Sequence, residues 1–399
     1  MVLNVGSELK EKFAKGIDAF TSSLSISNYK PIPDFNRPLI QNPSVHHAFP
    51  SHFDAIDKKW VEPELNPDQI QPASIELKAG DKIWQVDYLF SSKQGNFEED
   101  LSKYGKEIEI NPDKPEVVLK KGKIYVLRSY ERLSLPRNIE ASADAKSTTG
   151  RVGCLCQLLS KGSYSNLPKG YGQVYPEHVY SFIEPHAFNL ILNPLKTRFF
   201  QLRFRINGTG YINTEKLKEV YGKERGINWF VNDKKMPLED VIDENALKMT
   251  LSTKRIYKQK NTKIPLDLTK KEEYNPKDFF EEIKGNGEIM MKPNKLYLFG
   301  TKESIEMGPY AGHLTRTDKF IESSLFSHFA GLFDPWFKGG ITLEMWSPKP
   351  TLLRDGDYIG KVYFEESEGL ILPSSGYHGS YKNQDAPKLP KIFKNNQSL

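Results

Sequence analysis

A carboxylate lies within an apolar stretch near the C-terminus, Ile341-Thr342-Leu343-Glu344-Met345. The β-branched and apolar neighbours predict a strand here. Because burial disfavours the charged form of a carboxyl group, Glu344 is expected to resist ionisation. Such a group is able to carry a proton near neutral pH. The alternative is an edge-strand glutamate that points to water, since Glu is seldom buried.

A second polar cluster combines hydroxyls, a glycine and two cations in the segment Lys146-Ser147-Thr148-Thr149-Gly150-Arg151. Hydroxyl and backbone N–H groups donate to phosphate, and an arginine forks onto two oxygens. The spacing differs from a Walker loop, which ends in Gly-Lys-Ser/Thr. The cluster predicts a phosphate site, with a polar turn as the alternative.

Glycine, serine and tyrosine dominate the segment 376–384, which ends in Tyr381-Lys382-Asn383-Gln384. A segment of this composition is mobile enough to close over a ligand, and its amide and phenol groups are able to contact a base. The alternative is a frayed terminus.

The composition limits the class of protein. The chain has 399 residues, of which 38% are hydrophobic and 12% aromatic, so a folded core and more than one domain are expected. A net charge of +5 is mild for this length; it argues against a nucleic-acid polymer as partner and suits a small anionic ligand. Cys154 and Cys156 are too close on one strand face to favour a disulfide, which indicates a reducing compartment. We see no signal-peptide pattern and no apolar run of membrane-span length, so we expect a cytoplasmic protein with no membrane contact.

Short strands separated by turns predict a mainly β fold in two modules. We expect an N-terminal extension over 1–58, a first β module over 59–206, a short helical and basic connector over 207–265, and a second β module over 266–399. The two β modules echo each other: Lys123-Ile124-Tyr125-Val126 is followed by Glu131, and Lys295-Leu296-Tyr297-Leu298 by Glu303. This is a weak internal repeat of one module.

Taken in order, the motifs resemble the dCTP deaminases of the dUTPase-like superfamily, and the layout resembles the long, two-module bacterial form. The resemblance covers about residues 66–395. It implies two dUTPase-like distorted β-barrel or β-roll modules joined by the connector. The motifs that carry it are Gln71-Pro72-Ala73-Ser74-Ile75-Glu76-Leu77, Ser147 with Arg151 four residues later, Asp334-Pro335, Thr342-Leu343-Glu344 and Tyr381-Lys382-Asn383-Gln384.

The resemblance also implies roles for single residues. Glu344 falls on the catalytic glutamate, and Ser147 belongs to the segment that holds triphosphate and positions water. Lys146 replaces an arginine of that segment, so a bidentate contact is lost while the charge remains. The substrate-binding residues that the resemblance implies are Lys146, Arg151, Asp334, Thr342, Tyr381 and Gln384.

Neither module carries the complete set. Module one has the Ser/Arg segment but no matching glutamate in its counterpart strand, Tyr180–Pro185. Module two has the glutamate, but Ile321 stands where the second arginine belongs. We therefore expect one site per chain that combines Lys146, Ser147 and Arg151 with Glu344 and Gln384.

The implied reaction is hydrolytic deamination of dCTP to dUTP and ammonia by general acid/base attack at C4. The His-x-Glu and Pro-Cys-x-x-Cys patterns of zinc deaminases are missing from the sequence, so no zinc is expected. We expect Mg²⁺ only through the triphosphate, dCTP or dUTP as the partner, and a homo-oligomer. The alternatives are a dUTPase-like diphosphohydrolase, a bifunctional dCTP deaminase/dUTPase, and a non-catalytic nucleotide sensor.

Overall fold

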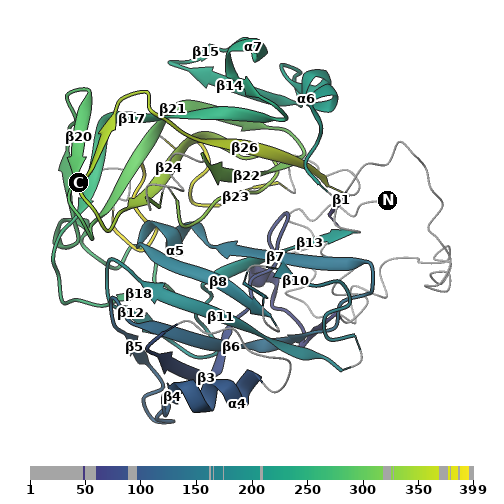
Figure 1. Ribbon diagram of the computed structural model, residues 1–399, viewed down its shortest axis with the longest axis vertical. Coiled ribbons are helices and arrows are strands. Elements are labelled where there is room, and N and C mark those ends of the chain that lie inside the picture. Colours follow the sequence, from purple (N-terminus) through teal and green to yellow (C-terminus); the bar gives the residue numbers. More distant parts are fainter. Residues whose placement is uncertain are drawn as a thin grey trace.

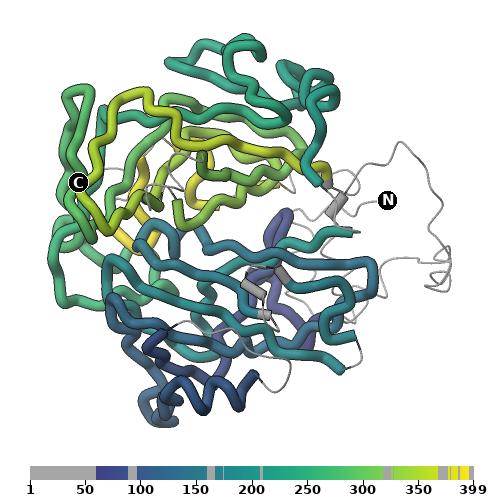
Figure 2. The backbone as a smooth tube through the Cα atoms, in the orientation of Figure 1, coloured from purple at the N-terminus to yellow at the C-terminus, as the bar shows by residue number. Residues whose placement is uncertain are grey.

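Two β-rich halves lie one above the other in the computed structural model (Figure 1). We call residues 60–206 module 1 and residues 210–367 module 2. In Figure 2 the blue module 1 fills the lower half, and the green and yellow module 2 fills the upper half. The structure describes residues 48–49, 60–88, 97–160, 163–164, 166–173, 175–206, 210–317, 325–326, 328–367, 376–377, 379–384 and 387–394.

Module 1 is built from one large sheet and two small ones, with helix α4 (Phe97–Tyr104) at its outer end (Figure 1). The seven-stranded sheet contains β2 (Val61–Glu62), β3 (Ala79–Val86), β4 (Gly105–Glu107), β6 (Ile124–Leu133), β8 (Cys154–Ser160), β9 (Ser163–Tyr164) and β11 (Glu177–Pro185). The three-stranded sheets contain β7 (Ile139–Ala145), β10 (Asn166–Leu167) and β13 (Phe200–Ile206), and β5 (Val117–Leu119), β12 (Leu190–Leu192) and β18 (Leu266–Asp267).

Module 2 is built on an eleven-stranded sheet, a two-stranded ribbon and the helices α6 (Thr214–Val220) and α7 (Leu238–Val241). The large sheet contains β1 (Ala48–Phe49), β14 (Ile227–Val231), β15 (Lys234–Lys235), β16 (Ile242–Asp243), β17 (Ala246–Gln259), β19 (Phe280–Ile283), β21 (Leu296–Met307), β22 (Tyr310–Arg316), β23 (Leu332–Phe333), β24 (Lys338–Trp346) and β26 (Tyr358–Ser367). The ribbon pairs β20 (Glu288–Met291) with β25 (Thr351–Arg354), and two short 3-10 turns cover Pro67–Gln69 and Pro276–Asp278.

The predicted mainly β fold is confirmed, but the predicted connector 207–265 needs correction. Helix α6 lies where a short helix was expected. Helix α7 ends at Val241, and Glu244 (φ 57°) turns the chain tightly from β16 into β17. Strand β17 then runs through the basic stretch and pairs with both β21 and β26. Its side chains alternate between buried and less buried positions, so its lysines and arginine point outward while Leu251 and Ile256 enter the core.

The boundary predicted at residue 266 also differs from the structure. Strand β18 pairs with β12 of module 1, and the buried core of module 1 takes up Phe279, Phe280 and Phe393. The Phe188 ring of module 1 lies 5.6 Å from Phe279 and 5.5 Å from Phe280, centroid to centroid. The chain therefore crosses between the modules several times, which fixes the surfaces that face each other.

Most of the predicted N-terminal extension, residues 1–47 and 50–58, lies outside the described residues, as does Ile321. Within the described ranges, no helix is both long and apolar enough to cross a membrane.

Candidate active site

The short helix α5 (Ser147–Arg151) lies at the boundary between the modules (Figure 1). Lys146 precedes it with an extended backbone (φ −70°, ψ 150°), which turns the chain from β7 into the helix. A Cβ atom on Gly150 would lie 2.8 Å from the Cβ of Ala330 and 3.2 Å from the Cδ of Glu344. Because a side chain would collide there, glycine lets α5 pack directly against the carboxyl group supplied by module 2.

Glu344 lies in the middle of β24, opposite Leu298 of β21, and is only 2% exposed. Its Oε2 accepts hydrogen bonds from the backbone N–H groups of Phe329 (3.2 Å) and Ala330 (3.4 Å). Burial raises the pKa of Glu344 to about 7, against the opposing effects of the Arg151 charge and the two backbone N–H groups. The prediction that this carboxyl group is buried is confirmed, and the raised pKa has the direction expected from burial.

Arg151 joins that carboxyl to the C-terminal segment. Its Nε lies 3.9 Å from Oε1 of Glu344. Its Nη1 donates to the carbonyl of Lys388 (2.7 Å), its Nη2 donates to Oε1 of Gln384 (3.1 Å), and its guanidinium lies 3.8 Å from the centre of the Tyr381 ring. With 4% exposure and these partners, Arg151 is enclosed beside Glu344. The arrangement favours a bracing role over the expected open contact with phosphate.

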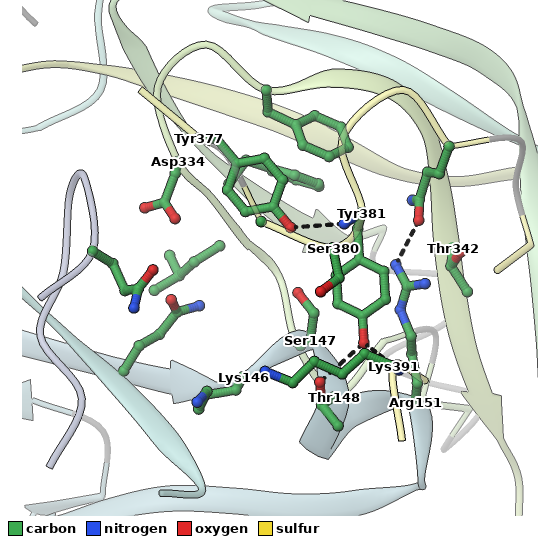
Figure 3. A pocket seen from close by; sticks show the side chains of 18 of the residues that line it. Lys146, Ser147, Thr148, Arg151, Asp334, Thr342, Tyr377, Ser380, Tyr381 and Lys391 are labelled. Atoms are coloured by element: carbon green, nitrogen blue, oxygen red, sulfur yellow. Dashed lines mark hydrogen bonds between the residues drawn. The ribbon is translucent and has the colours of Figure 1, made fainter. Parts of the chain in front are cut away.

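The C-terminal segment reaches α5 through side chains that point into the space between the modules (Figure 3). The hydroxyl of Tyr381 meets Oγ1 of Thr148 at 2.9 Å and accepts the backbone N–H of Lys391 at 3.1 Å. Gln384 is fixed on β24, where its Nε2 donates to the carbonyl of Gly340 at 2.7 Å. Thr342 accepts the backbone N–H of Lys388 at 3.0 Å, so its hydroxyl holds the segment in place.

The segment is anchored at its far end as well, which corrects the picture of a free lid or a frayed terminus. Leu389, Ile392 and Phe393 have no exposed surface and belong to the core of module 1. Backbone hydrogen bonds link Lys394 and Ile392 to Tyr274. We call residues 376–394 the strap, because its described parts contact module 2 at one end and module 1 at the other.

A cavity of about 310 Å³ lies between the modules and under the strap. All residues that the sequence analysis singled out for the site line it. They are Lys146, Ser147, Arg151, Asp334, Thr342, Glu344, Tyr381 and Gln384.

The two ends of the cavity differ in charge. In Figure 3, Asp334 and Tyr377 lie at one end and Lys146 and Lys391 at the other, with Ser147 and Ser380 between them. At the second end, Oε2 of Glu76 accepts Nζ of Lys146 at 2.6 Å and lies 3.3 Å from Nη1 of Arg198. The cationic end suits a polyanion.

Asp334 supplies an acceptor at the opposite end. Its Oδ1 is buried and has no hydrogen-bond partner in the described part of the chain. Burial raises its pKa to about 6, although the Arg203 charge and the backbone N–H of Ala73 act against that shift. A buried oxygen without a partner calls for a donor from a ligand or water.

The sequence analysis missed Arg198 and Lys391 as lining residues, and it quoted Glu76 without assigning it a role. Arg198 lies in the turn before β13 and Lys391 beyond the recognised tail motif, so neither has a local signal other than its charge. Among the described residues, no group of three or more His, Cys, Asp or Glu is placed to hold a metal ion.

Two family models match successive parts of the chain. The N-terminal domain of 2'-deoxycytidine 5'-triphosphate deaminase matches residues 52–209, and the dCTP deaminase-like family matches residues 231–367. The second match begins inside the predicted connector, in agreement with the place of β17 in module 2.

Two curated relatives carry the name "dCTP deaminase, dUMP-forming". The protein of Methanosphaera stadtmanae is 31% identical over 94 residues, which make up 23% of this chain and 47% of that protein. The protein of Clostridium acetobutylicum is 30% identical over 107 residues, which make up 27% of this chain and 61% of that protein. The chain thus spans about half the length of the curated relatives that it matches.

A crystal structure of 2'-deoxycytidine 5'-triphosphate deaminase from Agrobacterium tumefaciens shares the fold, with a TM-score of 0.71 and 23% identity. The match covers 82% of this chain and all of that chain. Together the two family models cover most of the described residues of both modules, and this chain therefore belongs to the dCTP deaminase family.

Proposed function

We propose that the protein is a dCTP deaminase that converts dCTP and water to dUTP and ammonia. One observation carries the proposal: Arg151 from module 1 and Glu344 from module 2 lie side by side in a cavity with one cationic end. Nε of Arg151 is 3.9 Å from Oε1 of Glu344. A carboxyl group with a pKa near 7 is matched to proton transfer at neutral pH.

The proposed reaction follows from these groups. Neutral Glu344 protonates N3 of the cytosine ring, which makes C4 more electrophilic. The carboxylate that results takes a proton from the water that attacks C4, and the Ser147 hydroxyl helps to hold this water. Glu344 passes this proton to the 4-amino group, the C4–N bond breaks, and ammonia leaves. The C4 hydroxyl that remains gives its proton back to Glu344 as the carbonyl forms, which restores the neutral acid.

The charges of the cavity suggest how the substrate lies. We place the triphosphate at the end formed by Lys146, Arg198 and Lys391, and the nucleoside toward Asp334 and Tyr377. The unpartnered Oδ1 of Asp334 accepts a hydrogen bond from the nucleoside. Arg151 acts on the geometry of Glu344 and the strap.

We propose Mg²⁺ as a companion of the triphosphate. This ion prefers oxygen ligands and usually keeps several waters. The described residues offer no cluster of three or more His, Cys, Asp or Glu ligands, so phosphate oxygens and water would supply most of its coordination. When bound, the ion neutralises part of the phosphate charge at the cationic end.

A second candidate, the bifunctional enzyme that continues from dUTP to dUMP, is favoured by the name of both curated relatives, "dCTP deaminase, dUMP-forming". The expected homo-oligomer and cytoplasmic location stay predictions. The contacts of Arg151 with Glu344 and Gln384, on which the proposed site is built, lie within one chain.

The test is to incubate the protein with dCTP and Mg²⁺, measure ammonia, and separate dCTP, dUTP and dUMP. Ammonia with accumulated dUTP supports the deaminase, and ammonia with dUMP but no free dUTP supports the bifunctional enzyme. Binding of nucleotide without release of ammonia would indicate a non-catalytic nucleotide sensor. The Glu344→Gln protein is the control for a contaminating activity.

A further inference from the structure

A short stretch of backbone beside Glu344 is held from both modules. The N–H groups of Phe329 and Ala330 donate to Oε2 of Glu344, at 3.2 and 3.4 Å. The next N–H, that of Gly331, donates to Oδ2 of Asp144 at 2.6 Å. Three successive N–H groups thus serve two carboxylates from two modules. We call residues 329–331 the shared loop.

Asp144 is well placed to fix the shared loop. It lies near the end of β7, two residues before Lys146, and its backbone is held in the sheet opposite Gln201 of β13. Its second oxygen, Oδ1, accepts the N–H of Ala145 at 2.8 Å. Both carboxylate oxygens are therefore engaged, and the side chain has a defined orientation toward module 2.

The surroundings leave the shared loop little room to move independently of Glu344. Gly150 of α5 packs closely on Ala330 and on the Glu344 carboxyl carbon. On the other side, the carbonyl of Gly331 accepts the N–H of Leu314 at 2.8 Å. A displacement at Gly331 would be transmitted to the two N–H groups that orient Glu344.

We propose that Asp144 is a positioning residue for the acid/base group Glu344, which it orients through the shared loop. Its negative charge is held on the same run of three N–H groups and therefore acts on Glu344 as well. The inference rests on the proposed deaminase function. Nothing in the local sequence marks Asp144, because its partner N–H lies in the other module.

The charged groups that face Glu344 are few. Arg151 on α5 lowers the pKa of Glu344, and Asp144 on β7 raises it. His328, next to the shared loop, is half-buried, and desolvation lowers its pKa to about 3, so it is neutral near pH 7. From the strap, the side chains of Gln384 and Tyr381 contact Arg151, and both side chains are uncharged near pH 7. Asp144 is the carboxylate whose charge opposes the ionisation of Glu344.

The direction of the pH effect follows from the mechanism. The neutral form of Glu344 begins the reaction, so kcat/KM falls as the pH rises through its pKa, near 7 in the wild type. Removing the Asp144 charge makes Glu344 easier to ionise. The alkaline limb of the pH profile then moves to lower pH.

Three variants separate the charge from the contact. Asp144→Asn keeps one acceptor oxygen, which is able to serve Gly331, but loses the charge and the acceptor for Ala145. We expect the alkaline limb to move down by about half a pH unit. Asp144→Ala also frees the shared loop, and we expect kcat to fall about tenfold to a hundredfold with little change in KM. Asp144→Glu keeps the charge in a displaced position, so kcat falls while the limb stays in place.

The matched control is Asp233→Asn in the exposed turn between β14 and β15, where φ is +62° and asparagine is well tolerated. It should leave both the rate and the pH profile unchanged. The thermal midpoint of every variant reports whether it is folded.

Each part of the proposal has a result that would contradict it. If Asp144→Asn is folded and its alkaline limb stays in place, the charge of Asp144 has no effect on Glu344. If kcat is unchanged in Asp144→Ala, Asp144 does not orient Glu344. A loss of thermal stability without either kinetic change would show a purely structural residue. If the wild type releases no ammonia from dCTP, the proposed function itself has failed, which is a different outcome from any of these.

Discussion

Modules 1 and 2 repeat the same side-chain contacts at corresponding places in their sheets. The hydroxyl of Tyr125 accepts the N–H of Lys120 at 2.8 Å, and that of Tyr297 accepts the N–H of Lys292 at 3.0 Å. The spacing is five residues in both cases. Each tyrosine ties its strand to the turn before it, so the sequence echo marks a real repeat of one folding unit.

A buried glutamate repeats in the same way. Glu131 accepts the N–H of Lys78 at 2.8 Å, and Glu303 accepts the N–H of Thr250 at 2.9 Å. In each module a hydroxyl two residues earlier donates to the carbonyl of this glutamate. These contacts satisfy backbone groups where two strands separate, which each module needs in order to fold.

The modules differ where the chemistry lies. Val126 follows Tyr125 and faces Phe182 across the strand pair, while Leu298 follows Tyr297 and faces Glu344. A fully buried phenylalanine therefore occupies in module 1 the position of the acid/base candidate in module 2. Folding contacts are needed in both copies, whereas a site that spans the boundary needs each catalytic group only once.

The largest expected effect comes from replacing the carboxyl group that only module 2 carries at this position. Glu344→Gln keeps the size of the side chain but cannot carry a proton, so the deamination rate should fall by about 10²–10⁴. Nucleotide affinity should change far less, because the cationic end of the cavity is intact. Steady-state kinetics with dCTP give both values. Glu282→Gln on the exposed edge strand β19 is the control, and equal rates for the two variants would remove Glu344 from the mechanism.

Mixing two inactive chains tests whether the modules of one chain build the site together. Arg151 and Glu344 contact each other within the same chain. An Arg151→Ala protein and a Glu344→Gln protein should each be inactive, and a mixture should remain so after prolonged incubation. Recovery of activity in the mixture would show that sites form between chains.

The next largest effect is expected on stability, from a substitution at the contact between the two modules. Arg203 and Arg205 of β13 both contact Glu365 of β26, at 3.2 and 2.7 Å, and Arg203 has no exposed surface. Glu365→Ala removes the carboxylate that both arginine side chains contact, and the free energy of unfolding should fall by about 3–5 kcal/mol. Urea denaturation measures this loss.

The neighbouring residue provides a matched control. Glu366 pairs with Lys216 at 3.4 Å near the surface, and Glu366→Ala should cost less than about 1 kcal/mol. Similar losses for the two variants would mean that the buried cluster does not hold the modules together.

The sequence alone predicted the features that are encoded in a local residue pattern or in the order of the motifs. The mainly β fold, the buried character of Glu344 and the set of cavity-lining residues agree with the structure. The strand β17 was missed because its exposed positions carry lysine and arginine, which in sequence are typical of a linker. Its apolar positions alternate with them, and this alternation was the available signal.

Other features depend on contacts between distant parts of the chain. Asp144 and Lys391 acquire their places only when module 1, module 2 and the strap come together. The anchor of the strap is a few apolar residues within a polar tail, too short for any periodic pattern. The same limit applies to Arg151, whose partners in the strap lie more than two hundred residues away.

The buried carboxyl should also lower the stability of the protein at alkaline pH. The pKa of Glu344 is about 7 in the folded protein, compared with an ordinary value of 4.5. Below pH 4.5 the group is neutral in both states and costs nothing. As the pH rises from 4.5 to 7, only the unfolded state releases the proton, so folding becomes less favourable.

Glu344→Gln should remove this cost. The variant should gain up to about 3 kcal/mol in the free energy of unfolding at pH 8 and almost nothing at pH 4.5. The comparison of wild type and variant at the two pH values isolates this group from Asp144 and Asp334, whose pKa values are also raised by burial. A gain of the same size at both pH values would contradict the assignment.

The smallest expected effect concerns how the strap is held against module 1. The Tyr381 hydroxyl makes one contact with module 1, to Oγ1 of Thr148, and one within the strap, to the N–H of Lys391. Tyr381→Phe removes both and keeps the ring that lies on Arg151, so nucleotide affinity should weaken by about 1 kcal/mol, or roughly fivefold. Tyr175→Phe, at a tyrosine that is 77% exposed, should have no effect.

A double-mutant cycle with Thr148→Val shows whether this loss comes from the contact between the strap and α5. If the two hydroxyls act as a pair, the double variant should bind nucleotide about as well as Tyr381→Phe alone, because the second substitution removes a partner that is already lost. Losses that simply add would mean that each hydroxyl contacts the ligand or water independently. The strap would then close over the cavity through its anchors in the two cores, and α5 would serve Glu344 through Gly150 and Arg151 alone.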